Sequence, residues 1–120
     1  MNQYNTKILD DSEVSINYCA KILRNGEIIG MPTETVYGLA GDALNPSAIK
    51  KIFIAKGRPQ DNPLIVHIAD ISMLDELVYD IPEIAYKLAD KFWPGPLTMV
   101  FKKKEIIPFE TSGGLDTVGI

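Results

Sequence analysis

Two cations and the single histidine of the chain lie within one short segment, residues 55–68 (AKGRPQDNPLIVHI). Lys56 and Arg58 are two residues apart, and Pro59 restricts the backbone directly after them. An arginine can clamp two oxygens of a phosphate group, while a lysine acts as a point charge. Held in a partly dry cleft, such a pair could stabilise the charge that develops on a phosphoryl group. The segment is therefore a candidate site for an anionic, phosphate-bearing substrate.

The same residues also have structural interpretations. Lys56 lies seven residues after Ile49, on the apolar stripe of a predicted helix over 46–56, so its side chain either extends to water or points into a cleft. The helical phase does not decide between these two positions. His67 shares one face of a predicted buried strand with Ile65, and a lone histidine there is more often structural than functional.

The predicted secondary structure around these residues alternates between helix and strand, as in a layered mixed domain. Asp11 or Ser12 is suited to cap the first helix, and Asn45 with Pro46 is suited to begin the second. The predicted buried face of the first helix consists of Ile16, Cys19, Ala20 and Leu23. The predicted helices span residues 12–25, 46–56, 71–79 and 83–92. The predicted strands span residues 27–31, 64–68, 97–101 and 117–120, and the last is entered through a predicted glycine turn in the segment ETSGGLD.

Composition bounds the class of protein. The chain has 120 residues, 46% of them apolar, and a net charge of −4, which argues against a non-specific nucleic-acid binder. No apolar run approaches the roughly 20 residues that span a bilayer, and the first residues lack a secretory signal. A single cysteine, Cys19, cannot form an internal disulfide, so we expect a reducing, cytoplasmic setting. The run Lys102–Lys104 is predicted to be a solvated strand end.

Several common sites are absent from the sequence. It contains no GxxxxGK[ST] phosphate loop, no GxGxxG after a strand, and no GxSxG elbow. It also lacks a cluster of histidines and cysteines, so a tetrahedral zinc site is not expected. The segment around Lys56 and Arg58 is the remaining candidate for a functional site.

Four strings, PTETVYGL, KGRPQDNPLIVHI, WPGPLT and GLDTVGI, follow one another at characteristic separations. In this order they resemble the YrdC-like family of threonylcarbamoyl-AMP synthases, from about residue 20 to the end of the chain. The resemblance implies an α+β fold, with a twisted mixed β-sheet flanked by helices around a concave, positively charged pocket. It implies a nucleotidyltransferase that converts L-threonine, bicarbonate and ATP, accompanied by Mg²⁺, into threonylcarbamoyl-AMP and pyrophosphate. Separate proteins then use the product for t6A modification of tRNA.

The resemblance also assigns roles to individual residues. It implies that Lys56 and Arg58 stabilise the reacting phosphates, and that Asn62 and Thr111 help them to bind ATP. It places Thr33 and His67 at the threonine, while Tyr37 is either a wall of the pocket or a buried aromatic. It implies no protein ligands for a metal.

Family members continue past TVGI with an arginine-containing segment and a Ser-x-Asn stretch. We therefore expect residues 1–120 to be a single YrdC-like domain that is incomplete at its C-terminal end, with weak or no synthase activity alone. An open strand edge and exposed apolar surface would favour a homodimer. The alternatives are a module that binds tRNA or double-stranded RNA without catalysis, and a carbamoyl-transfer domain of a hydrogenase-maturation protein.

Overall fold

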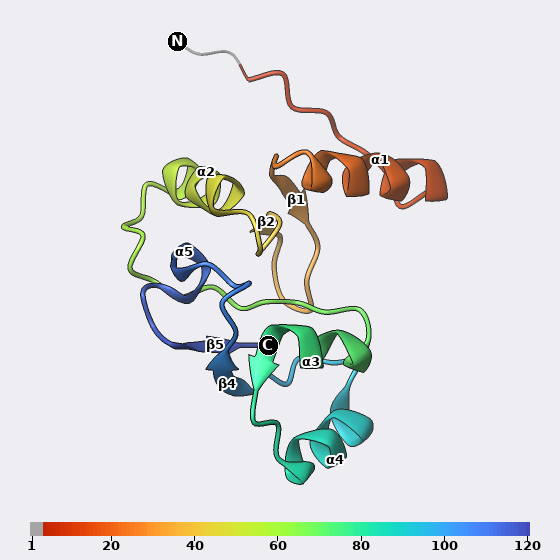
Figure 1. The fold of residues 1–120 in the computed structure, drawn as a ribbon. Coiled ribbons are helices and arrows are strands. Elements are labelled where there is room, and N and C mark those ends of the chain that lie inside the picture. The colour runs from red at the N-terminus through yellow and green to blue at the C-terminus, as the bar shows by residue number, and fades with distance from the viewer. Residues whose placement is uncertain (1–3) are drawn as a thin grey trace.

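A computed structural model describes residues 4–120. It is an α+β arrangement, as predicted, with helices and short strands in alternation (Figure 1). The helices are α1 (Glu13–Arg24), α2 (Pro46–Lys56), the 3-10 turn η1 (Ile71–Met73), α3 (Leu74–Leu77), α4 (Glu83–Phe92) and α5 (Phe109–Ser112). The strands are β1 (Ile29–Met31), β2 (Gly38–Ala40), β3 (Val78–Tyr79), β4 (Val100–Lys103) and β5 (Thr117–Gly119). Within residues 4–120, no helix combines the length and apolar character needed to cross a membrane.

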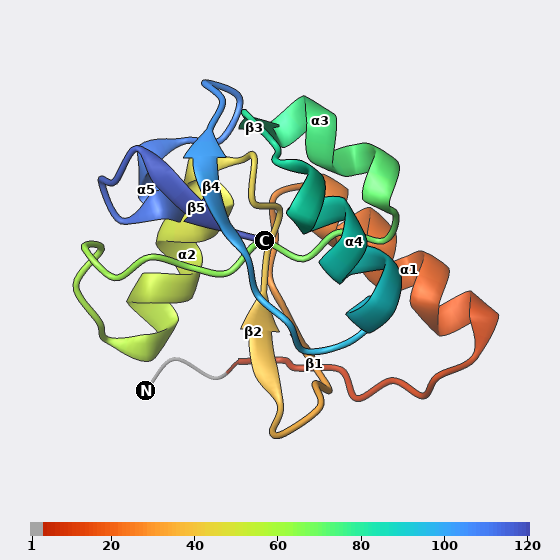
Figure 2. The same cartoon turned by 90° about the horizontal axis from the view of Figure 1, so that it is seen from below.

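The strands form two small antiparallel sheets, not one continuous mixed sheet. β1 pairs with β2, and β3, β4 and β5 form a second sheet in that order. The parallel component is an isolated bridge between Ile65 and Gly119. The β1–β2 hairpin projects away from the second sheet (Figure 2). The predicted strand over 64–68 is therefore reduced to this bridge, because Leu64 and Val66 donate hydrogen bonds to residues of α5 and β5 and not to a continuous neighbouring strand.

Two hydrophobic clusters hold these elements together. The larger one packs α3, α4 and the three-stranded sheet, and its fully or nearly buried members are Val66, Leu74, Leu77, Val78, Ala85, Phe101, Ile107, Val118 and Ile120. The smaller one consists of Ile49, Ile52 and Phe53 on α2, packed against Ile28 and Leu64. The predicted apolar stripe of α2 is thus confirmed, and it fixes the helix that carries Lys56.

The first helix is capped as predicted but is packed less deeply. Ser12 accepts a hydrogen bond from the Ser15 amide, and Gly26 follows the helix with a φ of +80°. No residue of α1 is buried, and Ile16 is 58% exposed, so its assignment to a buried face is wrong. The physical reason is placement: α1 lies at the edge of the molecule and packs chiefly against β1 (Figure 1).

Three further segments differ from prediction. Residues 71–79 begin as a helix, but Val78 and Tyr79 turn extended and pair with Lys103 and Lys102 of β4. The segment before the glycine pair, predicted as a turn, contains the short helix α5. In the lysine run, Lys104 donates through Nζ to the Asp75 carbonyl at 2.6 Å, so this run also makes tertiary contacts.

Candidate functional site

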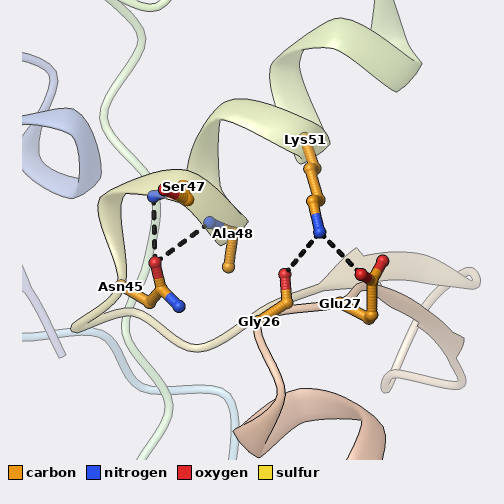
Figure 3. A network of polar contacts seen from close by, with 6 residues as sticks. All are labelled: Gly26, Glu27, Asn45, Ser47, Ala48 and Lys51. Carbon is orange, nitrogen blue, oxygen red and sulfur yellow. Dashed lines mark hydrogen bonds and ion pairs between the residues drawn. The ribbon is translucent and has the colours of Figure 1, made fainter.

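Helix α2 presents Lys56 at its C-terminal end. The Asn45 side chain accepts hydrogen bonds from the amides of Ser47 (3.0 Å) and Ala48 (3.4 Å), which satisfies donors of the first turn (Figure 3). Gly57 ends the helix in the left-handed conformation, with a φ of +62°. Both ends were predicted from the sequence. Lys56 therefore stands in the last turn, where the helix dipole favours a cation.

A second lysine, Lys51, anchors the middle of the same helix. Lys51 donates through Nζ to the Glu27 carboxylate at 2.8 Å and to the Gly26 carbonyl at 3.0 Å (Figure 3). This contact ties α2 to the segment between α1 and β1. The pair is partly solvent-exposed, so its contribution to stability is modest.

Lys56 and Arg58 are both exposed, and neither forms an ion pair with any residue between 4 and 120. The ion pairs within residues 4–120 are Lys51–Glu27 and Lys87–Glu83. The backbone of Arg58 is nevertheless fixed, since its amide donates to the Phe53 carbonyl at 3.1 Å. Two positive charges therefore lie on a tethered backbone, with no carboxylate at ion-pair distance among the described residues. Chemically, the arrangement is suited to an external anion.

The loop that follows brings Asn62 beside α5. Asn62 is exposed, and the next residues lead to Leu64, whose amide donates to the Thr111 carbonyl at 2.9 Å. Of the predicted nucleotide ligands, Asn62 and Thr111 are thus neighbours through the backbone. In both views α5 lies beside α2 (Figure 1, Figure 2).

The Thr111 side chain does not fit its predicted role. It has no exposed surface, and its hydroxyl donates to the Ala43 carbonyl at 2.6 Å. A buried hydroxyl that already has a partner cannot meet a ligand approaching from solvent. We interpret Thr111 as an anchor that joins α5 to the loop before α2.

Thr33 and His67 lie on two other segments, and both are exposed. The Thr33 hydroxyl donates to the Val36 carbonyl and accepts from the Thr35 amide at 3.3 Å, which stiffens the turn after β1. The His67 ring places Nδ1 at 3.2 Å from the Ile65 carbonyl. His67 faces outward with Ile65, as the alternation predicted, and Leu64, Val66 and Ile68 face inward.

None of the predicted site residues lines either of the two best-formed depressions in the described part of the chain. These two depressions, of about 300 and 270 Å³, lie beside Tyr79. Tyr37 in the turn after β1 is 79% exposed, so the alternative of a buried aromatic is wrong. Between residues 4 and 120, no three His, Cys, Asp or Glu side chains gather as metal ligands would.

Two tyrosines that line these depressions are hydrogen-bonded to carboxylates. Tyr79 donates to Glu105 at 2.7 Å, which raises the pKa of the phenol and lowers the pKa of Glu105. Tyr86 donates to Asp75 at 3.0 Å, which raises the pKa of Tyr86 in the same way. Both pairs are on the surface, away from Lys56, so they belong to the scaffold and not to the candidate site.

Residues 21–120 match the family model Sua5/YciO/YrdC, described as "Telomere recombination". The chain belongs to this family. The threonylcarbamoyl-AMP synthase of Pyrococcus abyssi is 53% identical over 108 residues, and that of Bacillus subtilis is 48% identical over 116 residues. The alignments cover 90% and 96% of this chain but 32% and 34% of those proteins, so the chain spans about a third of their length.

Solved structures of the family have the same arrangement. The crystal structure of P. abyssi Sua5 complexed with L-threonine matches with a TM-score of 0.86 at 53% identity, over 90% of this chain and 32% of that one. Escherichia coli YciO matches with a TM-score of 0.74 at 22% identity, which supports the fold alone. The YrdC-like fold expected from the four sequence strings is therefore confirmed.

Proposed function

We propose that this chain carries part of the ATP and L-threonine site of a threonylcarbamoyl-AMP synthase. The observation that supports this most directly is the pair Lys56 and Arg58, held on fixed backbone without an ion-pair partner within residues 4–120. The pair occurs in a chain 53% identical to a protein named threonylcarbamoyl-AMP synthase. The substrates of the proposed reaction are L-threonine, bicarbonate and ATP, and the products are threonylcarbamoyl-AMP and pyrophosphate.

In the proposed reaction, the amine of threonine first attacks the carbon of bicarbonate, which forms a carbamate and releases water. A carbamate oxygen attacks the α-phosphorus of ATP, and the bond between that phosphorus and the bridging oxygen of pyrophosphate breaks. Negative charge builds on the phosphate oxygens and on the leaving group, where Lys56 and Arg58 act as electrostatic stabilisers. Mg²⁺ would arrive on the triphosphate, because this ion is commonly held by substrate phosphates and few protein groups. Asn62 supplies a neutral donor and acceptor to the nucleotide.

Thr33 and His67 are suited to accept hydrogen bonds from the amino group of threonine. The Thr33 hydroxyl uses its proton on the Val36 carbonyl, so toward a substrate it would act as an acceptor, in exchange for its contacts with Thr35. When Nδ1 of His67 carries the proton, it donates to the Ile65 carbonyl and leaves Nε2 as an acceptor. Both acceptors are exposed and their orientations are fixed by local contacts. Positioning of the reactants supplies most of the catalysis in this scheme.

The test is calorimetric titration of the chain with Mg-ATP and with L-threonine, together with pyrophosphate release when bicarbonate is added. Lys56→Ala and Arg58→Ala should each weaken ATP binding by about tenfold or more, since each removes a charge-assisted contact. Lys50→Ala is the matched control, because Lys50 is exposed on the same helix. Melting temperatures should not change. Equal ATP affinity in all three variants would contradict the electrostatic role.

Three related expectations remain part of the proposal. The product would serve tRNA modification by other threonylcarbamoylation proteins, in the cytoplasm. Self-association of the chain is expected because apolar side chains such as Val14 (80% exposed) and Ile16 are uncovered. Binding of tRNA or double-stranded RNA is the alternative function, and the net charge of −4 disfavours it. RNA affinity that falls steeply with salt, without ATP binding, would favour that alternative.

A further inference from the structure

The loop between α2 and the His67 segment is held at its two ends. The Arg58 amide donates to the Phe53 carbonyl at one end, and the Leu64 amide donates to the Thr111 carbonyl at the other. Residues 58–63 between them are all exposed. No side chain in this stretch makes a hydrogen bond within the described part of the chain. The position of Asn62 therefore depends on how the backbone of the loop meets α5.

Gly113, directly after α5, is the point of closest approach. A Cβ atom at Gly113 would stand 2.7 Å from the Asp61 carbonyl oxygen, 2.7 Å from the Pro63 nitrogen and 3.0 Å from the Asn62 carbonyl carbon. All three neighbours are backbone atoms, so no side-chain rotation can relieve the overlap. Any side chain at Gly113 must push the loop away from α5.

We propose that Gly113 is a positioning residue for the ATP site. Because Gly113 has no side chain, the backbone of residues 61–63 packs directly against it, and this contact fixes the loop that carries Arg58 and Asn62. The inference rests on the proposed function, because it takes this loop as the nucleotide-binding one. Thr111 helps to hold α5 in position for this contact, since its buried hydroxyl donates a hydrogen bond to the Ala43 carbonyl. The loop is thereby set against an element of the core instead of moving freely in solvent, which limits the entropy lost when a nucleotide binds.

The chain contains matched controls for the contact at Gly113. Gly114 and Gly57 also have positive φ values, +83° and +62°, close to the +64° of Gly113. A Cβ at either would meet no atom within 4 Å. Alanine at all three positions therefore carries a similar backbone strain, but only Gly113→Ala also displaces the loop.

The experiment compares Gly113→Ala with Gly114→Ala. Mg-ATP titration should show at least a tenfold loss of affinity in Gly113→Ala, with Gly114→Ala close to the unmodified chain. The affinity for L-threonine should be similar in both, because Thr33 lies on another segment and His67 lies beyond the Leu64 and Val66 hydrogen bonds that hold the chain after the loop. Amide chemical shifts without ligand should change in Gly113→Ala around residues 58–64 and stay constant in β4. Equal ATP affinities in the two variants, or shift changes spread evenly over the β-sheet, would overturn the proposal.

Pro63→Gly covers the case in which Gly113→Ala does not fold. This substitution makes the loop more flexible where it contacts Gly113 and leaves α5 intact. It should therefore lower the affinity for ATP but not the affinity for L-threonine. Unchanged ATP binding in Pro63→Gly would refute the positioning role. If the unmodified chain binds no ATP, the proposed function fails, while the chemical shifts of the ligand-free variants still test whether Gly113 sets the loop.

Discussion

Replacing Thr111 by valine separates two roles for this residue. The substitution keeps the branched shape but removes the hydroxyl that donates to the Ala43 carbonyl at 2.6 Å. Thr111 is fully buried, so no solvent donor takes its place directly. Leaving a carbonyl without its donor costs about 1–3 kcal/mol of unfolding free energy. At about 4 °C per kcal/mol for a chain of this size, the melting temperature should fall by about 4–12 °C.

The assay is urea unfolding followed by circular dichroism, with Mg-ATP titration of the folded protein beside it. Thr98→Val is the control, since Thr98 is exposed and its hydroxyl has no hydrogen-bond partner in the described part of the chain. That variant should stay within about 0.5 kcal/mol of the original. If Thr111 is a structural anchor, Thr111→Val should lower the free energy of unfolding by more than it weakens the free energy of ATP binding. Full stability combined with lost ATP binding would refute this reasoning and restore Thr111 as a nucleotide contact.

Three further predictions follow from local contacts. Asn45→Ala should lower the unfolding free energy by about 1 kcal/mol, measured by urea unfolding, because it removes the cap of α2; an unchanged midpoint would contradict the capping bonds. The pKa of Asp10 should be about 2, below the ordinary 3.8, because the hydroxyls of Ser12 and Ser15 donate to its carboxylate. The stabilisation from Asp10 is then present above pH 3.8 and lost as the pH falls through 2, and NMR titration of Ser12→Ala should show the pKa returning upward. Sedimentation velocity should show dimers of the unmodified chain, and a strict monomer at all concentrations would exclude the expected self-association.

The limits of sequence reasoning are clearest around α5. The glycine pair at 113–114 was visible in the sequence, but a turn was predicted where α5 forms, and the two glycines looked equivalent. The structure separates them, because only Gly113 meets the backbone of residues 61–63. That contact joins segments about 50 residues apart in the chain, and no local pattern reports it.

Features governed by neighbouring residues could be predicted from the amino-acid sequence alone. Asn45, Pro46 and Gly57 set the ends of α2, since capping and left-handed termination depend on a few adjacent backbone groups. The order of four short strings also sufficed to predict the family. The tertiary structure decided that Ile16 is exposed, that Val78 joins a sheet, and that Thr111 faces the core. These outcomes depend on which distant segment packs against each residue, and burial of apolar surface between distant segments outweighs local propensity.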